Sequence, residues 1–171
     1  MVKRSAELLL TVPLVAATGA LFWLVPDSPL RHLDDPTYWA ILAYGCLLLT
    51  LAGLRLSRRP GSGRRRERVV LAIFLGAMPL VYLASAARLG AAAAWWALEA
   101  FGLVLYTGLA TWSLTTAWLL PVGLLAHGIW DLAHHQRTPF LADWYAVACA
   151  VVDLGVCIYA TQMVRDCVVA S

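Results

Sequence analysis

Of the 171 residues, 61% are hydrophobic and 13% are charged, whereas a soluble domain has about 25% charged residues. So few charges cannot cover a water-facing surface, which excludes an ordinary soluble protein and indicates a surface that faces lipid. The net charge of +3 comes mainly from one arginine-rich stretch, so we expect no nucleic-acid partner. The length fits a single domain, residues 1–171.

Polar and Gly/Pro breaks divide the chain into six apolar segments, each near the roughly 20 residues that a helix needs to cross the hydrocarbon core. Backbone groups in lipid must be satisfied within the protein, so we expect an all-α integral membrane protein, a bundle of six transmembrane helices. The predicted spans cover residues 6–25, 37–56, 69–86, 91–111, 116–135 and 142–164. The first resembles a secretory signal, but its apolar run continues further, and we interpret it as an uncleaved span.

The fifth segment is the least regular of the six. Pro121 lies within it and should kink it or loosen its first half. If this segment were re-entrant instead of spanning, the carboxyl terminus would lie on the opposite side of the membrane. The four cysteines lack CxxC spacing, and we interpret them as small buried residues.

The distribution of Lys and Arg predicts the orientation. Residues 55–68 contain seven arginines around Pro-Gly-Ser-Gly, which indicates a flexible basic loop in the cytoplasm. Six spans place ten of the 13 basic residues on that side, so both termini are expected to be cytoplasmic. We also expect the loop to contact anionic lipid headgroups. The Arg-rich, Lys-poor usage suggests a bacterial plasma (inner) membrane.

Residues 126–135, AHGIWDLAHH, contain three of the four histidines. In a helix His127, Asp131, His134 and His135 share one face, because they are spaced at i, i+4, i+7 and i+8. Ionisable groups within a span are costly, about 2.5–3.5 kcal/mol for Asp at a helix centre, and usually face the bundle interior. These four residues are therefore candidate metal ligands.

Two further acids should enter the membrane from the same, outer side. At 1.5 Å per residue, Glu99 and Asp153 lie about 13 and 16 Å deep, close to the depth of about 12 Å for His127, and Asp131 lies about half as deep as His127. Either acid would be an additional ligand, a support for a ligand, or a general base. Imidazole and carboxylate ligands suit one divalent ion, Zn or alternatively Fe or Mn.

His127, Asp131, His134 and Asp153 together resemble the site of membrane-embedded metal hydrolases of the ceramidase type. In those enzymes histidines and an aspartate from several helices surround a zinc ion. The resemblance covers only these four residues, and the number and spacing of the spans differ. It implies a zinc-dependent hydrolase acting within the membrane.

Two hypotheses of different class follow for this multi-pass protein. The first is a metal-dependent hydrolase of a lipid-like substrate, in which Asp153 and Glu99 are the catalytic candidates. The second is a non-catalytic subunit of a larger membrane complex, in which the polar cluster serves folding or docking with other membrane subunits. A proton or ion carrier is a weaker third possibility, because few polar residues are predicted in the inner half.

Overall fold

The computed structural model describes residues 35–56 and 65–169, together with Ala16. Within these residues every regular element is a helix, which confirms the all-α prediction. The helices are α2 (Pro36–Leu56), α3 (Arg65–Ala77), α4 (Pro79–Leu89), α5 (Ala93–Ser113), α6 (Leu119–His134) and α7 (Asp143–Val169). The predicted first span, residues 6–25, lies outside the described residues.

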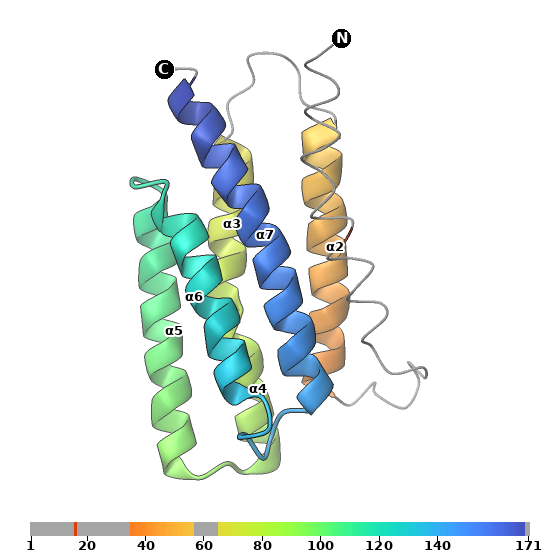
Figure 1. Cartoon of the computed structure of the whole chain (residues 1–171). Coiled ribbons are helices and arrows are strands. Elements are labelled where there is room, and N and C mark those ends of the chain that lie inside the picture. Colours follow the sequence, from red (N-terminus) through yellow and green to blue (C-terminus); the bar gives the residue numbers. More distant parts are fainter. Residues whose placement is uncertain (1–15, 17–34, 57–64, 170–171) are drawn as a thin grey trace.

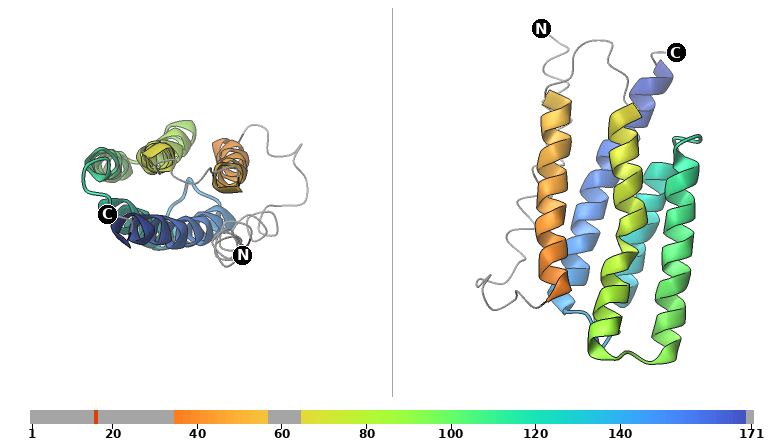
Figure 2. Two further views of the ribbon diagram at one scale, coloured as in Figure 1. Left: turned by 90° about the horizontal axis from the view of Figure 1, so that it is seen from above. Right: turned by 180° about the vertical axis from the view of Figure 1, so that it is seen from behind.

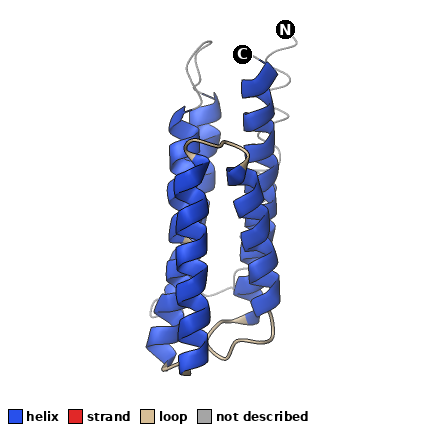
Figure 3. Ribbon diagram, turned by 90° about the vertical axis from the view of Figure 1, so that its left-hand side faces the viewer, coloured by secondary structure: helices blue, strands red, loops and turns tan. Residues whose placement is uncertain are grey.

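Helices α3 and α4 continue in one direction as a single rod, and with this rod taken as one unit consecutive helices run in alternating directions (Figure 1). The views from above and from the side show two layers, with α2, the α3–α4 rod and α5 in one and α6 and α7 in the other (Figures 2 and 3). The end of α2, the start of α3 and the end of α7 lie at the same end of the bundle. The arginines that begin α3 and the end of α7 therefore share one side; the assignment of that side to the cytoplasm remains a prediction.

Three described helices are long and apolar enough to cross a membrane: Arg65–Leu89, Ala93–Ser113 and Asp143–Asp166. Their outward side chains are apolar, and Val104 and Ile73 are 73% and 67% exposed. A bundle with exposed aliphatic residues and buried ionisable groups has the polarity expected in lipid. The chain is therefore a membrane protein.

Proline and glycine explain several helix boundaries. Pro79 separates α3 from α4 without breaking the rod, because the Met78 amide still donates to the Phe74 carbonyl at 3.1 Å. Gly90 ends α4 with φ 64°, a conformation that favours glycine. Pro121 lies in the first turn of α6, where backbone N–H groups have no partner within the helix. The N–H that proline lacks is therefore not needed there. Helix α6 therefore begins at Leu119, and not at residue 116 as predicted.

Helix α3 begins before the predicted third span. Residues 65–68 were expected to belong to the basic loop, but they form the first turn of α3. Hydropathy did not detect this turn because three of its four residues are arginines. Glu67 is nevertheless 4% exposed and accepts a hydrogen bond from Tyr159 Oη at 2.7 Å, so this turn packs against α7.

Candidate functional site

Five ionisable side chains are buried together in the bundle, on three helices. They are Glu99 on α5, His127, Asp131 and His134 on α6, and Asp153 on α7, and none is more than 4% exposed. The three residues of α6 share one face because the helix brings positions i, i+4 and i+7 together. That face is directed at α5 and α7 and not at lipid.

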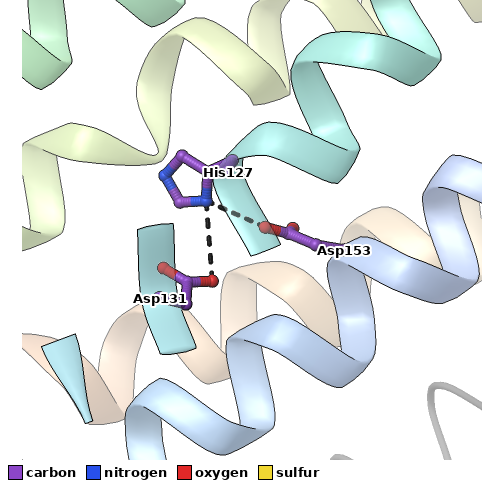
Figure 4. Close-up of side chains that lie close together, drawn as sticks. All are labelled: His127, Asp131 and Asp153. Atoms are coloured by element: carbon purple, nitrogen blue, oxygen red, sulfur yellow. Dashed lines mark hydrogen bonds and ion pairs between the residues drawn. The ribbon is translucent and has the colours of Figure 1, made fainter. Parts of the chain in front are cut away.

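His127, Asp131 and Asp153 form the first of two groups (Figure 4). His127 Nδ1 lies 2.8 Å from Asp153 Oδ2 and 3.5 Å from Asp131 Oδ2. One ligand atom from each residue lies within 4.8 Å of the other two. All three side chains are fully buried, so two carboxylates and one imidazole share a site that bulk water does not reach.

Two tyrosines hold this group in place. Tyr82 Oη on α4 donates a hydrogen bond to Asp131 Oδ1. Tyr106 on α5 packs edge-to-face on the His127 ring, with centroids 4.7 Å apart, and its hydroxyl donates to the Ala126 carbonyl at 3.1 Å. Side chains of the opposite layer therefore fix this group, which lies on α6 and α7.

Several polar atoms of the site have no hydrogen-bond partner among the described residues. They are His127 Nε2, Asp131 Oδ2, Asp153 Oδ1 and Glu99 Oε2. A buried polar atom without a partner costs about 1–3 kcal/mol. Four such atoms lie in this one region of the bundle.

Gly128 allows α6 and α7 to approach closely beside this group. A Cβ at this position would lie 3.2 Å from Asp153 Cβ, tighter than ordinary van der Waals contact. Glycine therefore sets the distance between the Asp153 backbone and the helix that presents His127 and Asp131.

Substituting Gly128 with alanine is expected to displace Asp153 by a few tenths of an ångström and to destabilise the protein by about 1–3 kcal/mol. The free energy of unfolding in mixed micelles would measure this change. Gly108→Ala is the matched control, because a Cβ at Gly108 meets nothing within 4 Å. Equal stabilities of the two variants would contradict the close approach at Gly128.

His134 and Glu99 form the second group. His134 Nε2 lies 2.8 Å from Glu99 Oε1, and His134 Nδ1 lies 2.8 Å from the Trp130 carbonyl oxygen. A carbonyl only accepts, so Nδ1 must be protonated. Nε2 then either donates to a carboxylate or accepts from a carboxylic acid, and in both cases the pair has no net charge.

Aromatic rings surround His134 and connect it to the first group. The centroids of Tyr82, Trp130 and Trp95 lie 4.8, 5.2 and 6.0 Å from that of His134. Tyr82 also donates its hydroxyl hydrogen bond to Asp131, so one side chain contacts both groups. The two groups therefore belong to one polar interior.

The structure divides the predicted ligand set. Of the four predicted ligands, His127 and Asp131 lie together, and Asp153 joins them. His134 lies against Glu99 instead, and the partly buried His135 contacts the Asp143 carbonyl, with Nδ1 at 3.3 Å. His135 follows the last residue of α6, where the chain leaves the helix.

The sequence interpretation missed the tyrosines that contact the site. Tyr82 and Tyr106 lie near the middle of their helical rods, away from the interfaces where Tyr usually anchors a span. A tyrosine at that depth needs a partner for its hydroxyl, and this was the signal available in the sequence.

Comparisons with known proteins give one result. No curated protein and no solved structure matches the chain. The model of a family of unknown function, DUF6010, matches residues 40–166, a stretch that contains all five buried ionisable residues described above. Because this match covers most of the sequence, the chain belongs to the DUF6010 family.

Proposed function

We propose that this protein is a membrane-embedded, metal-dependent hydrolase whose single divalent ion is bound by His127, Asp131 and Asp153. The observation that supports the proposal most directly is the convergence of one imidazole and two carboxylates, all fully buried, with ligand atoms within 4.8 Å. This set replaces the one predicted from sequence, because Asp153 takes the place of His134 and His135.

The charge of the site favours a divalent cation. With both aspartates ionised and His127 neutral, as metal ligands must be, the site would have a charge of −2 in a region that water does not reach. Buried charges of one sign are strongly unfavourable unless they are paired or coordinate a metal. A divalent ion would cancel this charge in full.

The positions of the atoms fit one ion. Two ligands of a zinc ion, each about 2.1 Å from it, can lie up to about 4 Å apart. His127 Nδ1 lies 2.8 and 3.5 Å from the two aspartate oxygens, and the ligand atoms of all three residues lie within 4.8 Å of one another, so small side-chain adjustments would bring them around one ion. Imidazole and carboxylate ligands suit Zn, Fe or Mn, and zinc is the proposed ion.

Three protein ligands are the number found in catalytic zinc sites, which keep one position for water or substrate. Such an ion would acidify its bound water and supply the nucleophile of a hydrolytic reaction. Tyr82 would orient Asp131 through its hydrogen bond. Glu99, with His134, is the proposed proton acceptor and donor.

The substrate class follows from the surroundings of the site. The helices around it expose aliphatic side chains, among them Val104, Ile129 and Leu154, so a molecule reaching the site from the side must come through lipid. We therefore propose a lipid-like substrate, in the half of the membrane opposite the arginine-rich loop. The bacterial plasma membrane remains the proposed location.

A second function is favoured by a different observation. Each buried ionisable group already has a partner within the chain: Glu99 with His134, His127 with Asp153, and Asp131 with Tyr82. A network of this kind also stabilises a bundle that has no catalytic role. This is the non-catalytic subunit of a larger membrane complex; a proton carrier would use the same network.

The metal content of the purified full chain tests the hydrolase. We expect one zinc ion per chain in the wild-type protein and a several-fold lower content in His127→Ala. His135→Ala is the matched control, since this histidine lies outside the group, and it should retain the ion. The zinc-loaded protein should also release a hydrolysis product from a bacterial lipid extract, detected by mass spectrometry.

Two results would reject the metal site: no zinc in the wild-type protein after growth and purification with zinc, or equal zinc in wild-type and His127→Ala protein. Either result, together with a partner that co-purifies at fixed stoichiometry, would favour the subunit instead. Zinc binding without any metal-dependent lipid product would reject the hydrolase function but would support the metal site.

A further inference from the structure

An apolar groove lies on the outer surface between the α3–α4 rod and α5, away from the buried site. It encloses about 370 Å³, within the roughly 300–1,000 Å³ of small-ligand pockets. Its walls include Val69, Ile73, Gly76 and Leu80 from the rod and Thr107 and Leu114 from α5. The rod and α5 lie side by side in both the front and the rear views (Figures 1 and 2).

The length of the groove matches one leaflet of a bilayer. From Val69 to Leu80 the helical rod rises about 16 Å at 1.5 Å per residue. The hydrocarbon core of a bilayer is about 30 Å thick, so the groove extends over about half of it. This is the depth that the acyl chain of a lipid in one leaflet occupies.

Two exposed arginines lie at the start of the same helix face. Arg65 and Arg66 precede Val69 by four and three residues, and they precede Ala72 and Ile73 by seven. These spacings place them in line with the groove on α3. Trp112 and Trp118, 63% and 44% exposed near this end of α5, are typical of the membrane–water interface.

We propose that this groove, with Arg65 and Arg66, binds one anionic phospholipid. The acyl chain lies along Val69, Ile73 and Leu80, and the phosphate pairs with the two guanidinium groups. The apolar length of the groove corresponds to the acyl chain of such a lipid, and the two arginines at its end correspond to the anionic phosphate. This inference does not depend on the metal ion proposed above.

A lipid fits this groove better than a second transmembrane helix. Helix pairs in membranes use small residues to approach each other closely. Here Gly76 already serves the bundle itself, since a Cβ on Gly76 would lie 3.5 Å from Ala110 Cβ on α5. The residues left at the rim, Ile73 and Leu80, are large and exposed.

Native mass spectrometry of the detergent-purified full chain tests the proposal. Phosphatidylglycerol and phosphatidylcholine with identical acyl chains are the two probes. We expect one phosphatidylglycerol to bind preferentially, and Arg65→Gln/Arg66→Gln to weaken its binding about 30-fold, which corresponds to about 1 kcal/mol per basic residue. Binding of phosphatidylcholine should not change.

Two further variants make the test specific. Arg88→Gln/Arg137→Gln removes two arginines at the opposite end of the bundle and should leave phosphatidylglycerol binding unchanged. Ala77→Phe fills the groove from an exposed position on its wall and should weaken the binding of both lipids without loss of folding. Millimolar inorganic phosphate should not displace the lipid.

Three results would overturn the proposal. Equal phosphatidylglycerol binding by wild-type and Arg65→Gln/Arg66→Gln protein would remove the role of the arginines. Unchanged binding by Ala77→Phe would remove the role of the groove. A dimer that Ala77→Phe converts to a monomer, with no change in bound lipid, would show that a second copy of the chain occupies the groove.

Discussion

Replacing Asp153 by asparagine is expected to lower the affinity for zinc more than 100-fold. The substitution removes one of the two negative charges of the proposed site and replaces a strong oxygen ligand with a weak one. Loss of a partner that only supports a ligand already costs about 10–100-fold in metal affinity, so loss of a ligand should cost more. Competition with a chromophoric zinc chelator would measure the affinity of the detergent-solubilised protein.

The asparagine variant suits this measurement because it preserves the size of the side chain. Asp153 Cβ packs against Gly128, and that contact remains in the variant. Asp143→Asn, at the first residue of the same helix, is the matched control and should bind zinc as the wild-type protein does. Wild-type affinity in Asp153→Asn would contradict the assignment of this residue as a ligand.

Replacing Glu99 by alanine is expected to lower the free energy of unfolding by about 1–3 kcal/mol. His134 Nε2 would lose its only described partner, while Nδ1 would stay bonded to the Trp130 carbonyl. The ring is 4% exposed, so water cannot readily replace the carboxyl group. Reversible unfolding in mixed micelles would give the difference.

Two related variants identify the cause of that loss. Glu99→Gln retains a side chain that can donate a hydrogen bond to a neutral His134, so its free energy of unfolding should fall less than that of Glu99→Ala. Glu99→Leu/His134→Leu removes both polar partners and should recover part of the stability, because an apolar pair leaves no orphaned atom. If Glu99→Ala unfolded with the wild-type free energy, the pair would have no structural role.

The face of α6 that forms the site was predictable from the sequence. His127, Asp131 and His134 are spaced by helical turns within an apolar segment, and ionisable groups in lipid turn inward. The structure buries all three on one side of α6. Their approximate depth in the membrane also follows from counting residues along each span. The same count placed Glu99 and Asp153 in the same half of the membrane and made them candidates for the site.

The pairing of these side chains was not predictable. Glu99 and Asp153 were expected at similar depths, so counting along the chain could not decide which would meet His127 and which would meet His134. The choice depends on the rotation of α5 and α7 about their axes. Helix packing sets that rotation, including the close approach of α6 and α7 at Gly128.

Tyr82 and Glu67 illustrate the same limit. Tyr82 contacts both polar groups only because the α3–α4 rod packs beside α6, and an apolar segment contains no signal of that packing. Glu67 was assigned to the basic loop because its neighbours are arginines. Its burial depends on Tyr159, 92 residues later in the chain.

The sequence by itself determined that the chain is helical and lies in a membrane, and that α6 presents its polar residues on one face. These properties follow from composition and from the helical period, which act locally. Tertiary structure decided that Asp153 faces His127 and that Glu99 faces His134, and it excluded His135 from both groups. Such choices depend on how rigid helices rotate and pack against one another, and packing depends on the side chains of several helices at once.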